Sequence, residues 1–284
     1  MNRHIRKVLV IVNIQKPDAE EMVSAIEGYL GKAGIKVAVF RIKDKPGILE
    51  IDDVDLAFAL GGDGTVLFSS RILAPKNIPI MAINLGNFGF ITEVAKDEWQ
   101  TAFDKYKNGV LGISERIMLV VNVERNGRRI EGFSGLNDAV ICAAGISKII
   151  SLKVSLSSTD LGEYRADGII VSTPTGSTAY SAAAGGPILD PEMEAMILNP
   201  ICPFTLSNRP VVVQGQEIIT VFVKEQQRTG VILTIDGQNV FPLKPGDTVK
   251  FRKAEQKALI IRSDKRNFFE VLKKKLNWSG GTDA

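Results

Sequence analysis

The residues best suited to chemistry form one short stretch, Gly61-Gly62-Asp63-Gly64-Thr65, in which three glycines surround a carboxylate. Glycine lets backbone N–H groups approach an anion closely, and the N-terminus of a following helix adds positive potential. No Gly-Lys-Ser/Thr follows, so the stretch is not a P-loop. A carboxylate in a phosphate-sized cradle would repel phosphate unless it holds a metal ion or takes a proton. The alternative is a purely structural role, as a tight turn capped by Asp63 or Thr65.

The flanking sequence predicts the elements that position this stretch. An apolar run, Val54–Leu60, is typical of a strand buried on both faces, and the residues from Thr65 to Ala74 have helical periodicity that ends at Pro75. A second buried strand is predicted over Ile80–Asn84. Alternating strands and helices over the first hundred residues indicate a parallel sheet. Ligands of such sheets bind at the carboxyl ends of the strands, where both Asp63 and Asn84 are expected.

Composition excludes several classes of function. A chain of 284 residues with 45% hydrophobic content can form one large domain or two smaller ones, and its net charge of +3 is too small to indicate nucleic acid binding. The only histidine is His4, which excludes Ser-His-Asp and Cys-His catalysis. Cys142 and Cys202 are not spaced as a metal site. No apolar run is long enough to span a membrane, so we expect a cytoplasmic protein.

A second group of polar residues lies in the other half of the chain, which is rich in strands from Ser114 onward. Asn137 and Asp138 stand between strand-like runs; they could form a turn, or they could hold a ribose, because vicinal hydroxyls donate well to a carboxylate. The segment from Thr173 to Gly186 is rich in hydroxyl groups and small residues and carries no charge. It is either a tightly packed capped helix or a neutral lining for a ligand that already carries phosphate.

These motifs together resemble the NAD kinase family. The Gly-Gly-Asp-Gly-Thr stretch is shared by NAD kinases, phosphofructokinases and lipid kinases. The motifs that narrow the resemblance to NAD kinases are Asn84-Leu-Gly86-Asn-Phe88-Gly89-Phe90, Leu136-Asn137-Asp138 and the run from Asp167 to Ile188. The resemblance extends from about Val54 to Val213. It implies phosphorylation of the 2′-hydroxyl of the adenosine ribose of NAD by ATP or polyphosphate, with Mg²⁺ accompanying the donor and no metal ligand assigned in the chain.

The resemblance also implies site residues. Asp63 is the expected catalytic base, and between glycines it has no evident core role, so its replacement by asparagine should keep nearly all the stability. The donor phosphate is expected at Gly61, Gly62, Gly64 and Thr65. The dinucleotide is expected at Asp63, Gly64, Asn84, Phe90, Asn137, Asp138, Arg165, Asp167, Ser177, Thr178, Ala179 and Tyr180. Most of the family has glutamate where this chain has Asp138, and often histidine where it has Phe204, so a role of that histidine does not transfer.

The expected fold is α/β plus all-β. A Rossmann-like nucleotide-binding domain covers residues 1–113, and by resemblance residues 263–284 return to pack on it. A β-rich, sandwich-like domain over residues 114–262 would bind the dinucleotide and mediate homo-oligomer formation. The alternatives are a lipid or sugar kinase of the same superfamily and a non-catalytic dinucleotide sensor. The sequence does not decide between ATP and polyphosphate, between NAD and NADH, or the size of the oligomer.

Overall fold

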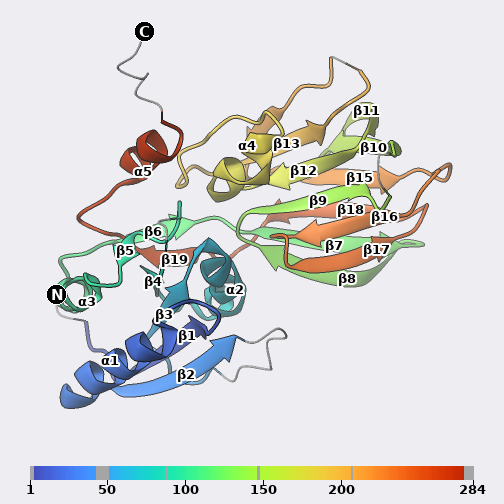
Figure 1. Cartoon of the computed structure of the whole chain (residues 1–284). Helices are drawn as coiled ribbons and strands as arrows, with labels where there is room; N and C mark the ends of the chain where they lie inside the picture. The colour runs from blue at the N-terminus through green and yellow to red at the C-terminus, as the bar shows by residue number, and fades with distance from the viewer. Residues whose placement is uncertain (1–2, 43–50, 87–88, 146–147, 206, 278–284) are drawn as a thin grey trace, which may run out of the picture. The chain divides into compact units, whose positions relative to one another are not determined.

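The structure is a computed structural model that describes residues 3–42, 51–86, 89–145, 148–205 and 207–277. Residues 87–88 of the Asn84–Phe90 motif and 278–284 of the C-terminal segment therefore lie outside the described residues. The chain divides into two compact units (Figure 1). The first consists of Met1–Glu115 with Ala258–Ala284, and the second of Arg116–Lys257.

The first unit is built on one mainly parallel sheet with the strand order β2-β1-β3-β4-β19-β6, and β5 pairs with β4. Its elements are β1 (Lys7–Asn13), α1 (Ala19–Lys32), β2 (Lys36–Ile42), β3 (Leu56–Gly61), α2 (Asp63–Leu73), a 3₁₀ turn (Ala74–Lys76), β4 (Ile80–Asn84), β5 (Val94–Ala95), α3 (Trp99–Lys107), β6 (Ile113–Arg116), β19 (Ala258–Ile261) and α5 (Phe268–Lys275). The predicted strand after Lys257 was placed in the β-rich domain, but β19 pairs with β4 in this sheet.

Helices cover both faces of this sheet. The apolar face of α1, formed by Met22, Ile26 and Leu30, is buried with side chains of α3 in one core cluster. Phe58 of β3 packs edge to face against Trp99 and Phe103 of α3, with ring centroids 6.0 and 5.9 Å apart. Helix α2 contacts the sheet through β1, β3, β4 and β19. Strands that are buried on both faces explain why β3 and β4 read as continuous apolar runs.

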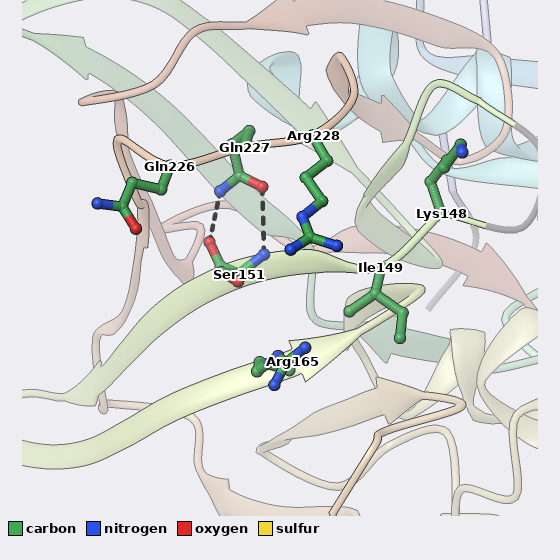
Figure 2. A pocket seen from close by; sticks show the side chains of 7 residues that line it. All are labelled: Lys148, Ile149, Ser151, Arg165, Gln226, Gln227 and Arg228. Carbon is green, nitrogen blue, oxygen red and sulfur yellow. Dashed lines mark hydrogen bonds between the residues drawn. The ribbon is translucent and has the colours of Figure 1, made fainter.

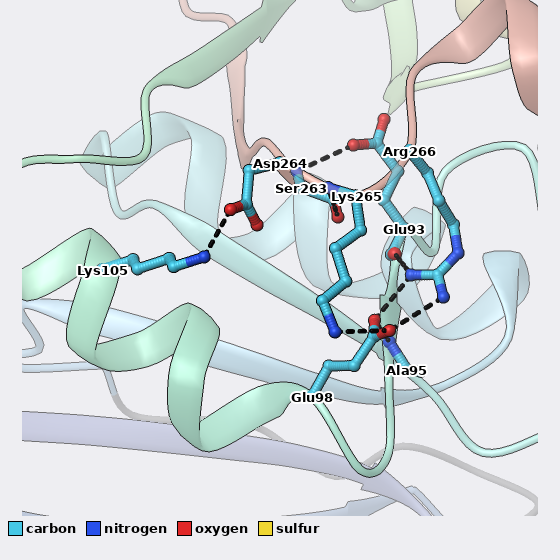
Figure 3. A network of polar contacts seen from close by, with 8 residues as sticks. All are labelled: Glu93, Ala95, Glu98, Lys105, Ser263, Asp264, Lys265 and Arg266. Carbon is cyan, nitrogen blue, oxygen red and sulfur yellow. Dashed lines mark hydrogen bonds and ion pairs between the residues drawn. The ribbon is translucent and has the colours of Figure 1, made fainter.

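A set of polar contacts fixes the C-terminal segment within the first unit (Figure 3). Both guanidinium nitrogens of Arg266 donate to the Glu98 carboxylate, at 2.6 and 2.9 Å. Lys265 also reaches Glu98, and the Ser263 N–H donates to Glu93. Asn267 then starts α5 with a reciprocal capping box to Glu270. These bonds place α5 beside the loop that follows β4.

The second unit is a sandwich of two antiparallel sheets, ordered β11-β10-β15-β18-β7-β8 and β14-β13-β12-β9-β16-β17 (Figure 1). The strands are β7 (Leu119–Arg125), β8 (Arg128–Gly135), β9 (Asp138–Ala143), β10 (Ile150–Leu156), β11 (Thr159–Ala166), β12 (Gly168–Ser172), β13 (Ala195–Ile201), β14 (Val211–Gln214), β15 (Ile219–Val223), β16 (Val231–Ile235), β17 (Asn239–Leu243) and β18 (Thr248–Lys253). A 3₁₀ turn (Thr175–Thr178) and α4 (Tyr180–Ala183) follow β12.

The inward side chains of both sheets form one core cluster, as the alternating sequence of this half predicts. A hairpin turn at Asn126-Gly127 joins β7 to β8, and its two residues have φ of 52° and 73°, as this pair of residue types favours. Among the helices that the structure describes, none is long and apolar enough to cross a membrane.

Candidate active site

Asp63 lies where β3 ends and α2 begins, with Gly62 at the N-cap position. The register of β3 and β4 pairs Gly61 with Asn84, so the two predicted loops leave the sheet side by side. The Leu85 N–H donates to the Gly61 carbonyl at 3.1 Å and joins the two loops. A Cβ added to Gly61 would lie 2.2 Å from Thr65 Oγ1, so this corner requires glycine. A Cβ added to Gly62 would have no atom within 4 Å, so there is room for a ligand beside Gly62.

The Asp63 carboxylate accepts four hydrogen bonds from the loop after β4. Oδ2 accepts from the Phe90 N–H at 2.8 Å. Oδ1 accepts from the Ile91 N–H, the Thr92 N–H and the Thr92 hydroxyl, each at 3.2 Å. A Cβ on Gly89 would lie 1.8 Å from Oδ1, so the backbone passes directly against the carboxylate. The expectation that Asp63 has no structural role is therefore wrong: this side chain anchors the loop.

Asn84 and Thr92 complete the anchor. The Thr92 hydroxyl accepts from Asn84 Nδ2 and from the Gly89 N–H, both at 3.0 Å, and Asn84 Oδ1 accepts from the Gly86 N–H at 2.6 Å. Asn84 is 3% exposed and Thr92 is fully buried. Asn84 thus fixes the loop, while its contact with the dinucleotide stays a prediction. Each carboxylate oxygen has about two acceptor positions. Oδ1 of Asp63 already accepts three hydrogen bonds, whereas Oδ2 accepts one and can accept another.

Phe90 lies at the junction of this loop and α5. Its half-buried ring has the Lys275 ammonium 4.9 Å from the ring centroid. Gly64, next along the chain from Asp63, is exposed, whereas Thr65 is 4% exposed and packs against Gly61. The contacts predicted for Gly61, Gly62, Gly64 and Thr65 with the donor phosphate stay predictions.

In the second unit, Asn137 and Asp138 stand where β9 begins, and the segment after β12 packs on them. The Thr173 N–H donates to the Asn137 carbonyl at 2.8 Å, and the Thr173 hydroxyl donates to the Leu136 carbonyl at 2.6 Å. A Cβ on Gly176 would lie 2.1 Å from the Asn137 carbonyl oxygen. The hydroxyl-rich turn and the Asn137–Asp138 pair are therefore one construction, as a shared ligand site requires.

Several side chains of this construction are polar and buried without a partner among the described residues. Asn137 Oδ1 and Thr175 Oγ1 have no hydrogen bond in the described part of the chain. Asp138 is 5% exposed, and burial, followed by the charge of Asp236, raises the pKa of its carboxyl to about 7. Native proteins pair nearly all such groups. Unpaired groups that cluster in this way indicate a ligand that supplies the missing partners.

The predicted residues after Thr175 are placed differently from one another. The Ser177 hydroxyl donates to the Pro174 carbonyl at 2.6 Å and accepts from the Leu189 N–H at 3.0 Å, so it stabilises the turn. The Thr178 hydroxyl donates to the Thr175 carbonyl. Tyr180 is 49% exposed, and its ring is available to a flat ligand. Ala179 lies between the 3₁₀ turn and α4.

Arg165 and Asp167 lie at the end of β11 and just beyond it, and both are exposed. Arg165 lines a cavity of about 610 Å³ with two other cationic residues, Lys148 and Arg228 (Figure 2). Gln227 fixes the rim of this cavity through two hydrogen bonds to the Ser151 backbone, at 3.2 and 2.6 Å. The Arg165 guanidinium also lies 5.0 Å from the centroid of the Phe204 ring.

Three residues that sequence reasoning did not assign to the site contribute to it. Thr92 accepts a hydrogen bond from the backbone of the loop after β4, and Asp236 accepts one from the backbone just before β9. Thr175 carries a buried hydroxyl with no partner among the described residues. The run of hydroxyl residues after β12 was a usable signal for Thr175. For Asp236 the signal was the weak resemblance of Asp236-Gly237-Gln238 to a turn of the NAD kinase family. Thr92 had none, because its partners are an amide across the loop, backbone atoms and Asp63, which is distant in the sequence.

Within the described residues, no group of three or more histidine, cysteine, aspartate or glutamate side chains could hold a metal ion. The crowded Asp63 carboxylate offers at most one free position. The donor set present therefore does not fit a metal held by the protein alone.

The fold and the site define the class of protein: a parallel α/β unit with the Gly-Gly-Asp-Gly-Thr corner at a helix N-terminus, and a β-sandwich unit with an Asn–Asp pair at the start of β9. Comparison with known proteins specifies the family. Residues 47–110 match the ATP-NAD kinase N-terminal domain, and residues 136–263 match the ATP-NAD kinase C-terminal domain. The chain belongs to the NAD kinase family.

Relatives and solved structures agree with this assignment. An NAD kinase of Treponema denticola is 41% identical over 281 residues, which cover 98% of each chain. One of Geobacter sulfurreducens is 38% identical and covers 96% of this chain and 99% of the relative. The NAD kinase of Archaeoglobus fulgidus in complex with ATP has a TM-score of 0.76 at 26% identity, covering 97% of this chain and 100% of that chain.

The yeast NADH kinase in complex with NADH has the same fold, with a TM-score of 0.85 at 22% identity, and covers 98% of this chain and 89% of that chain. The predicted family, fold class and enzyme activity are confirmed.

Proposed function

We propose that the chain transfers the γ-phosphoryl group of ATP, or a terminal phosphoryl group of polyphosphate, to the 2′-hydroxyl of the adenosine ribose of NAD, which gives NADP. The observation that carries this proposal is the Asp63 carboxylate, held by loop amides at the N-terminus of α2 with capacity left on Oδ2. The matches to ATP-NAD kinase domains support the choice of substrates.

In the proposed reaction, Oδ2 of Asp63 accepts the proton of the 2′-hydroxyl while the ribose oxygen bonds to the phosphorus and the bond from phosphorus to the leaving phosphate oxygen breaks. Positioning dominates such catalysis. The four accepted hydrogen bonds supply it, because they hold the carboxylate in one orientation. The positive end of α2 would attract the donor phosphates.

The second unit would bind the acceptor. Asp138 and Asn137 would accept hydrogen bonds from the ribose, and the Thr175 hydroxyl would donate one of the bonds that it lacks within the chain. Tyr180 would pack against a ring of the dinucleotide, and Ser177, Thr178 and Ala179 form the turn that carries it. Arg165, Asp167 and Phe90 stay proposed contacts.

A divalent metal such as Mg²⁺ would enter on the donor phosphates and offset their charge. The chain supplies no cage of its own among the described residues, so no step is assigned to a protein-bound metal.

We also infer a homo-oligomer formed through the β-rich unit. Edge strand β14 exposes Val211 and Val212, at 42% and 44%, which a partner could cover.

The test is incubation of the purified chain with ATP, Mg²⁺ and NAD, with NADP measured by an NADP-specific dehydrogenase. Parallel reactions replace ATP by polyphosphate and NAD by NADH. Formation of NADP at many turnovers per chain is expected. Binding of NAD without NADP formation from either donor would overturn the proposal and leave a dinucleotide sensor.

A further inference from the structure

Asp236 stands in the turn between β16 and β17, in a left-handed backbone conformation with φ of 52°. Its carboxylate accepts three backbone N–H groups in succession: Leu136 at 3.0 Å, Asn137 at 2.8 Å and Asp138 at 3.3 Å. Its own N–H donates to the Asp138 carbonyl at 2.9 Å. Asp236 is 8% exposed. One buried side chain, about a hundred residues away in sequence, thus holds the backbone of the predicted ribose-binding pair.

Thr173 bonds the same backbone segment from its other side. The carbonyl oxygens of Leu136 and Asn137 accept from the hydroxyl and the N–H of Thr173. The backbone is therefore fixed on its donor side and on its acceptor side. At this pair, the side-chain oxygen of Asn137 has no hydrogen-bond partner in the described part of the chain, and no hydrogen bond is among the causes that raise the pKa of the Asp138 carboxyl. The construction presents these two side chains to a ligand.

Asp138 and Asp236 are both buried, at 5% and 8% exposure, and the backbone of Asp138 is bonded to Asp236. Burial is the larger cause and the negative charge of Asp236 the second cause of the raised pKa of Asp138, about 7. The other elements packed against Asp138 add no cation to this balance: Ser172 is its partner in β12 and does not titrate, and α4 contributes Tyr180, whose pKa is raised chiefly by burial. Asp167, Cys142 and Cys202 also lie near Tyr180.

We propose that Asp236 is a positioning residue for the dinucleotide: it fixes the backbone of Asn137 and Asp138 and so holds their side chains in place for the ribose. This inference rests on the proposed function, because it assumes that Asp138 meets a ribose. Ribose hydroxyls donate to an ionised carboxylate, and a protonated one must first release its proton. NAD binding therefore releases a proton near neutral pH.

The expected change of NAD affinity with pH follows from the fraction of Asp138 that is ionised. When only one protonation state binds, the apparent Kd is the intrinsic Kd divided by the population of that state. With the pKa of Asp138 at about 7, NAD binds about tenfold more weakly at pH 6 than at pH 8. In Asp236→Asn the midpoint of the pH dependence of NAD binding moves to lower pH, because Asp138 has lost one negative neighbour. The midpoint stays above the ordinary pKa of 3.8, because Asp138 is still buried.

The experiment measures the NAD Kd by calorimetry from pH 5.5 to 8.5 and the ¹³C shift of the Asp138 carboxyl over the same range. The variants are Asp236→Asn and, as a matched control, Asp247→Asn. Asp247 is a fully buried aspartate of the same unit, which accepts from Arg125 at 2.7 and 2.8 Å and from the Lys244 N–H at 2.8 Å. Both changes should lower Tm. Only Asp236→Asn should lower the midpoint and weaken binding at pH 8.

If Asp236→Asn does not fold, Gly135→Ala replaces it, since the added Cβ would lie 2.8 Å from Ile235 Cγ2 and 3.0 Å from Asp236 Oδ1 and would shift both side chains slightly without removing the carboxylate. This variant should also shift the midpoint. Titration of Asp138 near its ordinary value in the wild type, or equal pH curves for the wild type, Asp236→Asn and Asp247→Asn, would overturn the inference. Wild-type chain that binds NAD with the expected pH curve but forms no NADP would instead overturn only the proposed function.

Discussion

Replacement of Asp63 by asparagine separates the two roles that the structure gives this side chain, because asparagine keeps its shape but loses its charge and one acceptor. In the variant, the amide oxygen can occupy the position of Oδ1, which faces three donors. The amide NH₂ then occupies the position of Oδ2 and faces the Phe90 N–H, which in the wild type donates to Oδ2 at 2.8 Å. Two donors would face each other there. One hydrogen bond to a charged group is lost, which is worth about 1.5–3 kcal/mol.

A loss of this size should lower the Tm by about 3–12 °C, given about 2–4 °C per kcal/mol for a chain of this size class. Turnover should fall much further, by roughly 10²–10⁴ as for removal of a general base. NAD affinity should weaken only modestly, because the amide still meets the ribose hydroxyl. The assays are calorimetric Tm, NAD binding, and kcat for NADP formation with both substrates saturating.

Thr92→Val is the matched control. It removes the hydroxyl that donates to Asp63 and accepts from Asn84 and Gly89, while the carboxylate keeps its three backbone donors. Its Tm should fall at least as far, since two buried donors lose their acceptor at about 1–3 kcal/mol each. Its kcat should stay within about tenfold of the wild type. A kcat for Asp63→Asn near that of the wild type, or an equal loss in Thr92→Val, would refute Asp63 as the base.

Three further variants and one further measurement test other predictions. Gly89→Ala should lower kcat by about 10²-fold through displacement of the loop, since its Cβ would lie 1.8 Å from Asp63 Oδ1; wild-type kcat and Tm would contradict the loop geometry. Asp138→Ala should raise the KM for NAD far more than that for ATP, and equal effects on both in steady-state kinetics would make Asp138 a structural residue. Arg266→Ala should lower the Tm at pH 7. Because Arg266 is the main cause that lowers the pKa of Glu98 to about 2, from an ordinary 4.5, the stabilisation is present above pH 4.5 and lost toward pH 2. The difference in Tm from the wild type should therefore shrink over that window, and a constant difference would contradict the ion pair. Sedimentation should show self-association, and a fully active monomer would contradict it.

Local signals predicted the corner around Asp63 well. A buried strand, glycines and a periodic apolar face placed β3, α2 and β4, and the strand order of a parallel sheet brought Asn84 beside Gly61. The loop anchor was not predictable in this way. Asp63 bonds backbone groups 27 to 29 residues away, and any residue type can supply a backbone N–H, so the sequence carries no mark of the contact.

The β-rich unit shows the same limit. Alternation predicted the strand β10, and β-rich composition the strand β16, but neither predicted their partners, because a period of two specifies the buried face and not the neighbour. Strand β19 was consequently given to the wrong sheet. Asp236 resembled a turn of the family only weakly in the sequence, and its bonds to three N–H groups about a hundred residues away could not be predicted from local pattern.

The central claim is that this chain moves a phosphoryl group to the 2′-oxygen of the adenosine ribose of NAD. The most direct measurement is ³¹P NMR of the product formed by the purified chain from ATP, Mg²⁺ and NAD, with ADP measured in the same sample. The account predicts one new phosphomonoester on the 2′-oxygen for each ADP released, and none with Asp63→Asn on the same time scale. Release of ADP without that phosphomonoester, or a phosphate on another oxygen, would contradict it.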